Sequence, residues 1–175
     1  MPSFPRRINP AQRRVYERSD ATTSVRLQPT IRLRAAVAAL PEGLASAEPH
    51  AVQELAQAVV DEITNGLRVA RARVVVHGTR PSDRRGELHG LYTAGPGRPA
   101  TIEVWMRTAK RGQVVAFKTF LRTLLHELCH HLDYTLLALG DSVHSDGFYK
   151  RESSLFHQLG AGGIALTSKP TSAPE

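Results

Sequence analysis

Residues 117–140 read FKTFLRTLLHELCHHLDYTLLALG and form the longest stretch of regularly spaced apolar residues after residue 67. Its apolar residues recur at intervals of three and four, which is the spacing of one face of an α-helix. These residues are Phe117, Leu121, Leu124, Leu128 and Leu132. Gly140 is a typical residue for a helix end. We therefore expect one long helix over 117–139 that forms the apolar centre of the fold.

The same helix contains the motif H-E-x-x-H at residues 126–130, which chance would place in this composition only about 0.02 times. His126 and His130 lie four positions apart, so both project from one face about 6 Å apart, as two ligands of one tetrahedral zinc ion would. Glu127 lies about 100° round the helix and can reach water beside the ion, where it would act as general base and acid. Solvated surface histidines are the alternative, which the flanking apolar stripe disfavours.

A zinc ion that performs chemistry usually has three protein ligands, so a third must come from elsewhere in the chain. The longer pattern H-E-x-x-H-x-x-G-x-x-H fails, because Asp133 and Leu136 stand where Gly and His are needed. His144 is the preferred third ligand, since the loop after the helix can span up to about 17 Å and return it to the motif. Glu152 is the alternative: it lies on the expected core face of the last helix and needs a partner there, which could also be a ligand histidine.

Two neighbours of the motif are expected to play other parts. Asp133 lies on the stripe that carries the two histidines, and we expect it to support them or the local structure rather than bind metal. His131 points about 100° away from His130 and is expected to be solvated or locally bonded.

The surrounding sequence predicts an α+β fold. Apolar spacing predicts a core helix over 52–67 and a final helix over 148–159. Three strands are expected at 72–76, 88–93 and 101–107, separated by glycine- and proline-rich turns. In the third strand Ile102, Val104 and Met106 should face the core, and they alternate with Thr101, Glu103 and Trp105 on a partly exposed face. The order is therefore core helix, small three-stranded sheet, metal-binding helix and final helix.

The length of 175 residues fits one domain, and 23 Lys and Arg against 16 Asp and Glu give a net charge of +7. Residues 1–34 hold eight arginines and four prolines, which predicts a disordered basic arm that could neutralise nucleic-acid phosphates or simply solubilise the chain. We expect the domain over 35–164 and a second disordered segment over 165–175. A single cysteine, Cys129, excludes an internal disulfide, and no apolar run is long enough to span a membrane. A cytoplasmic protein is expected.

The residues Leu124 to His131, followed by His144 and a helix that begins near Gly147 and Phe148, resemble the SprT-like (Spartan-type) zinc metallopeptidases. The resemblance covers about residues 52–159, and its specific parts are the metal helix and the His144 segment. It implies a zincin-like fold, a polypeptide substrate that pairs with an edge strand beside the metal, and contact with DNA-associated proteins. Residues 101–107 would be that edge strand.

Together these observations predict a zinc-dependent endopeptidase with His126, His130 and His144 as metal ligands and Glu127 as the catalytic group. The main alternative is a basic nucleic-acid-binding or regulatory module whose metal site is structural and not catalytic. Such a site is normally closed by four protein ligands, and the fourth would have to be Cys129, Asp133 or Glu152.

Overall fold

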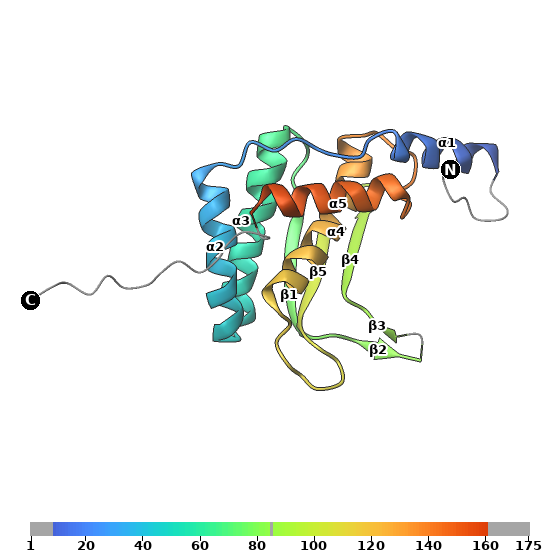
Figure 1. Cartoon of the computed structure of the whole chain (residues 1–175). Helices are drawn as coiled ribbons and strands as arrows, with labels where there is room; N and C mark the ends of the chain where they lie inside the picture. The colour runs from blue at the N-terminus through green and yellow to red at the C-terminus, as the bar shows by residue number, and fades with distance from the viewer. Residues whose placement is uncertain (1–8, 85, 161–175) are drawn as a thin grey trace, which may run out of the picture.

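The computed structural model describes residues 9–84 and 86–160, and this part of the chain is a mixed α+β protein, as expected (Figure 1). Within these ranges there are five α-helices, a sheet of three strands and a separate two-stranded ribbon. In chain order the elements are α1 Pro10–Asp20, α2 Ile31–Ser46, α3 Pro49–Leu67, β1 Arg73–Thr79, β2 Ser82–Asp83, β3 Gly86–Glu87, β4 Gly90–Gly95, β5 Arg98–Arg107, α4 Phe117–Thr135 and α5 Asp146–Gln158. The core helix, the three strands, the metal-binding helix and the final helix expected from the sequence correspond to α3, β1, β4, β5, α4 and α5.

β5 is the central strand of the sheet, because the strand order is β1-β5-β4. It runs parallel to β1 and antiparallel to β4, so that Val104 lies between Val76 and Gly90. The expectation that residues 101–107 form the edge beside the metal is therefore wrong. Both β5 and β4 pack against α4, and of these two β4 is the edge strand. Burial explains the placement: Val104 and Met106 are fully buried and even Trp105 is only 9% exposed, as is usual for a strand with neighbours on both sides.

α4 packs its apolar face against the sheet and α5 and forms the centre of the core. Its fully or nearly fully buried apolar residues are Phe120, Leu121, Leu124, Leu125, Leu128, Cys129 and Leu132. The helix ends at Thr135, four residues earlier than expected. The chain turns there because Ala138 adopts a left-handed conformation (φ 48°) and the Leu139 amide bonds back to the Asp133 carbonyl. Leu139 thereby returns to the core, and the loop to α5 is longer than the sequence predicted.

The described part of the N-terminal segment, residues 9–34, contains α1 and the start of α2, so the prediction of a disordered arm is wrong for these residues. α1 begins with a capping box between Asn9 and Gln12, and α2 begins at the cap Thr30. The segment between them and the start of α2 bury apolar side chains in the main core, including Val25, Leu27 and Leu33. The sequence prediction missed α2 because its apolar residues, although they recur at helical spacing, are interspersed at the start of the helix with exposed arginines.

Two further expectations concern the chain termini and membrane-spanning segments. Residues 1–8 and the expected disordered segment 165–175 lie outside the described residues. No helix in the described ranges is long and apolar enough to cross a membrane.

Candidate metal centre

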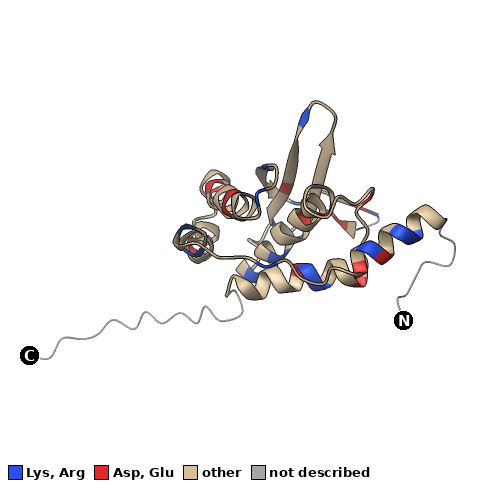
Figure 2. Ribbon diagram, turned by 90° about the horizontal axis from the view of Figure 1, so that it is seen from above, with Lys and Arg blue, Asp and Glu red and all other residues tan. Residues whose placement is uncertain are grey.

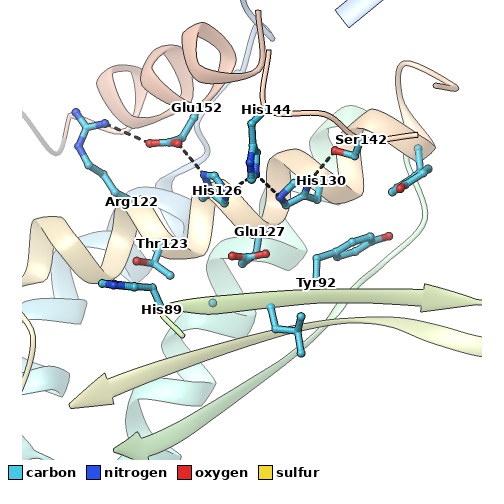
Figure 3. A pocket seen from close by; sticks show the side chains of 13 residues that line it. His89, Tyr92, Arg122, Thr123, His126, Glu127, His130, Ser142, His144 and Glu152 are labelled. Carbon is cyan, nitrogen blue, oxygen red and sulfur yellow. Dashed lines mark hydrogen bonds and ion pairs between the residues drawn. The ribbon is translucent and has the colours of Figure 1, made fainter. Parts of the chain in front are cut away.

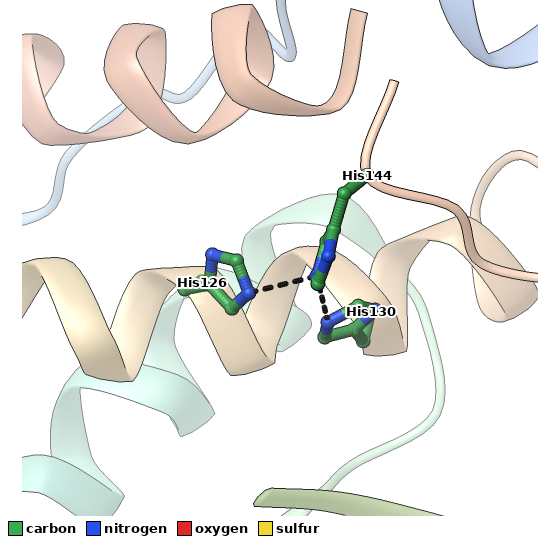
Figure 4. A group of neighbouring side chains, drawn as sticks. All are labelled: His126, His130 and His144. Carbon is green, nitrogen blue, oxygen red and sulfur yellow. Dashed lines mark hydrogen bonds between the residues drawn. The ribbon is translucent and has the colours of Figure 1, made fainter. Parts of the chain in front are cut away.

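Three histidines from two parts of the chain meet at one point (Figure 4). His126 and His130 lie one turn apart on α4, and His144 comes from the loop before α5. His144 Nε2 is 3.0 Å from His126 Nε2 and 3.1 Å from His130 Nε2, and the three ligand atoms lie within 4.8 Å of one another. Nitrogens bound to one tetrahedral zinc ion lie about 3.3 Å apart. The three side chains can therefore hold a metal ion.

The Phe148 ring packs against the rings of all three histidines. Its ring centroid lies 4.9 Å from that of His126, 4.8 Å from His130 and 5.0 Å from His144. Phe148 is fully buried in the first turn of α5, whose start is fixed by the Ser145 side chain accepting a hydrogen bond from the Phe148 amide. The beginning of α5 thus sets where His144 meets α4.

The tautomers of the two helix histidines follow from their Nδ1 partners. The Glu152 carboxylate lies 3.1 Å from His126 Nδ1, and an ionised carboxylate can only accept. Ser142 donates its hydroxyl proton to Asp133 at 2.7 Å, so it accepts from His130 Nδ1, also at 2.7 Å. Both histidines therefore carry their proton on Nδ1, which leaves the Nε2 lone pairs facing the common point.

The protonation state of the cluster also suits a cation. Burial, together with the neighbouring His126 and His144, lowers the pKa of His130 to about 4. Burial and His126 lower the pKa of His144 as well. Neutral imidazoles are the form that binds metal, because a ring nitrogen then has a free lone pair to give to the ion. A set of three imidazole nitrogens is typical of zinc and other transition metals.

Glu127 lies beside the histidines against the edge strand β4. The side chain is buried at 6% exposure, and burial raises its pKa to about 7, against the opposing effects of His126 and a hydrogen bond from the Tyr92 backbone N–H. Gly90 makes room for it, because a Cβ there would lie 2.8 Å from Glu127 Cγ. A carboxyl group with a pKa near neutrality is suited to take up and release a proton.

A cavity of about 570 Å³ opens in front of these groups (Figure 3). β4 forms one wall with Gly90, Leu91 and Tyr92, and α4 forms the opposite one. Figure 3 shows His126, Glu127, His130 and His144 grouped together among the side chains that line this cavity. The histidine cluster and Glu127 therefore line the same cavity.

The structure places the other candidate residues around the cluster and not within it. Glu152, the alternative third ligand, contacts the outer nitrogen of His126 and forms an ion pair with Arg122 at 3.4 Å. Asp133 is fully buried, pairs with Arg151 at 2.7 Å and reaches His130 through Ser142. Asp133 thus supports a candidate ligand, as the sequence suggested.

His131 differs from its expectation of a solvated or locally bonded side chain. It is 1% exposed, and Nε2 donates to the Ala70 carbonyl at 2.7 Å, so Nδ1 accepts from the Tyr92 hydroxyl at 3.1 Å. It fixes Tyr92, whose backbone holds Glu127. Because Ala70 and Tyr92 are distant in sequence, no local pattern indicates these bonds.

Sequence reasoning also missed Ser142, Gly90 and Tyr92. Ser142 lies two residues before His144, which is the one signal that could have pointed to it. Comparisons with protein-family models, with curated proteins and with solved structures give no match to this chain.

Proposed function

We propose that this protein is a zinc-dependent metallopeptidase with a zincin-like fold of the SprT-like kind. The observation that carries the proposal is the convergence of three imidazole side chains beside a buried carboxyl group, all lining one open cavity. His126, His130 and His144 would hold the zinc ion, and Glu127 would be the catalytic residue. The H-E-x-x-H order of these residues supports a hydrolase in particular, because the glutamate has no use in a purely structural site.

A bound zinc ion would supply Lewis acidity, which makes a peptide carbonyl more electrophilic and water more acidic. The Glu127 carboxylate accepts a proton from water as the water oxygen attacks the carbonyl carbon. As the carbon–nitrogen bond breaks, Glu127 gives that proton to the leaving nitrogen. The raised pKa of Glu127 suits both steps, since the group must first accept and then donate at neutral pH.

A structural metal site, which would fit a nucleic-acid-binding module, is less well supported. Such sites are normally closed by four protein ligands. Among the described residues only three candidate ligand side chains come together. Cys129 is buried, and Asp133 and Glu152 are engaged with Arg151, Ser142, Arg122 and the outer nitrogen of His126. The fourth position of the ion would instead face the cavity.

A polypeptide substrate is supported by β4. Within the described residues β4 pairs only with β5, and residues 90–92 line the cavity. An extended peptide could pair with that free edge, which would bind its backbone largely without regard to side-chain sequence. The role assigned from the sequence to residues 101–107 passes to β4 in this proposal.

The test compares Glu127→Gln with the wild-type chain on unfolded casein and for self-cleavage. We expect the variant to retain zinc and a near-native melting temperature but to lose hydrolysis by at least about 100-fold, because it cannot accept the proton. His144→Ala serves as the metal-depleted control. Equal hydrolysis by wild type and a zinc-loaded Glu127→Gln chain would overturn the proposal.

A further inference from the structure

The three candidate ligands are not equally supported. His126 and His130 lie on one rigid helix, and each has a partner on Nδ1. His144 lies on the loop between α4 and α5, and among the described residues its Nδ1 has no hydrogen-bond partner. Its position therefore depends on how that loop is held.

Three consecutive residues in the last turn of α1, Arg18, Ser19 and Asp20, form hydrogen bonds to this loop and to the start of α5. Arg18 donates through one guanidinium nitrogen to the Leu137 and Ala138 carbonyls, at 2.9 and 3.2 Å. These bonds satisfy carbonyls beyond the end of α4, where no further helical turn could do so.

The next two residues of α1, Ser19 and Asp20, contact the residues that follow His144 in the chain. The Ser19 hydroxyl lies 2.8 Å from the Ser145 hydroxyl, and the Asp20 carboxylate accepts the Gly147 backbone N–H at 2.8 Å. The packing is as close as backbone allows, because a Cβ on Gly147 would lie 2.6 Å from Asp20 Cα. His144 thus lies between two stretches that α1 fixes, residues 137–138 and 145–147.

Arg151 joins the same turn of α1 to a second ligand. Its guanidinium donates to the Ser19 carbonyl and the Thr22 carbonyl at 2.6 Å each, and to Asp133 at 2.7 Å. Asp133 in turn accepts from Ser142, which orients His130. Figure 1 shows that α1 otherwise lies at the periphery, beside the start of α5.

We propose that Arg18, Ser19 and Asp20 are positioning residues of the metal centre: they hold His144 against α4 and so set the affinity for the metal ion. The inference rests on metal binding by the three histidines, which is part of the proposed function, but not on peptide hydrolysis. In this proposal α1 positions His144, a role that the basic charge of the N-terminal region does not predict.

The experiment measures zinc affinity by competition with a chromophoric chelator, and the absorption spectrum of the Co²⁺-loaded chain. Asp20→Ala and Arg18→Ala should each lower zinc affinity about tenfold, the lower range for groups that support ligands. Asp20→Asn should keep near-wild-type affinity, because its amide oxygen still accepts the Gly147 N–H. Arg14→Ala, an exposed change on the same helix, is the matched control and should have no effect.

A second set of variants separates positioning from general destabilisation. In a His144→Ala background, Asp20→Ala should cause no further loss of the weaker metal binding that remains, since the residue acts through His144. An equal loss in both backgrounds, or an Asp20→Asn chain as weak as Asp20→Ala, would overturn the inference. A wild-type chain that binds no zinc would instead overturn the proposed function, which keeps the two failures apart.

Discussion

At the scale of single residues, His144 and Glu152 act on opposite nitrogens of His126. His144 faces Nε2 within the cluster, whereas Glu152 faces Nδ1 outside it. We therefore expect His144→Ala to lose most of the bound zinc, and Glu152→Ala to keep the ion with an affinity lowered by about 10- to 100-fold. Metal analysis after gel filtration, followed by titration with zinc, measures both.

His157→Ala provides the control for this comparison, because His157 is an exposed histidine on α5 whose side chain, among the described residues, contacts Ser153 and the ring of Phe156 and no group of the cluster. It should bind as much zinc as wild type. If Glu152→Ala lost the metal and His144→Ala retained it, Glu152 would be the third ligand and His144 would not.

Single residues also differ in how far the sequence reveals their part. His126, Glu127 and His130 are local to one helix, so their spacing alone predicts a shared face. Ser142, His131 and Tyr92 act through contacts between distant segments, such as the bond from His131 to Ala70. Such contacts depend on how α4, β4 and the loop before α5 pack together, and a local sequence pattern does not determine that packing.

At the scale of elements, α4 and β4 approach so closely at Gly90 that only glycine leaves room for Glu127. A Cβ at this position would lie 2.8 Å from Cγ and 2.9 Å from Cδ of the glutamate. We expect Gly90→Ala to keep zinc, to lower the free energy of unfolding by about 1–3 kcal/mol, and to lose most hydrolysis because the carboxyl group must move.

Gly95→Ala is the control on the same strand, because a Cβ at Gly95 meets nothing within 4 Å. Thermal melting and peptide hydrolysis are measured for both variants with zinc bound. A Gly90→Ala chain with wild-type activity would mean that Glu127 does not need its present place.

Helices and strands were predictable where apolar spacing is regular, and less so at their ends and in their order. α3 and the first part of α4 follow the period closely. The apolar residues 136–139 (LLAL) continue the apolar composition beyond the helix, yet Leu136 is 36% exposed and the chain has already turned. The order β1-β5-β4 follows from a parallel connection that no strand pattern encodes by itself.

At the scale of the whole molecule, the net charge of +7 is compatible with two roles of the N-terminal region, which are contact with nucleic acid and solubilisation of the chain. Figure 2 shows Lys and Arg along α1 and on several other elements. Because α1 is part of the fold, charge substitution is a better test than deletion. We expect the combined change of Arg6, Arg7, Arg14 and Arg26 to Gln to flatten the dependence of log affinity for duplex DNA on log salt by about three units, while zinc affinity stays constant.

Fluorescence anisotropy over a range of salt concentrations measures this slope. Arginines outside the N-terminal region give the control: Arg84→Gln and Arg98→Gln change exposed residues of the β2–β3 ribbon region and β5 and should have a smaller effect. Equal slopes for wild type and the four-residue variant would show that this region is no DNA anchor, and would leave the metal centre untouched.

N-terminal truncations of increasing length should affect zinc affinity and stability to different degrees. A chain that starts at residue 9 keeps every described element, so its melting temperature and zinc affinity should match the full chain. A chain that starts at residue 22 loses α1 and the acceptors of Arg151 on Ser19, but keeps the buried Val25 and Leu27. It should fold with stability lowered by about 1–3 kcal/mol and bind zinc more weakly.

A chain that starts at residue 35 loses Val25, Leu27 and Leu33 from the core. It also loses two hydrogen bonds of the Gln158 side chain, which donates to the Val25 carbonyl and accepts from the Leu27 N–H. Burial of each such side chain contributes about 1.5–3 kcal/mol, so the three together approach the whole stability of a typical domain. We therefore expect this chain not to unfold cooperatively when its circular dichroism is followed on heating. A cooperative transition at the full-length melting temperature would show that residues 35–164 fold alone and that the N-terminal segment only docks onto them.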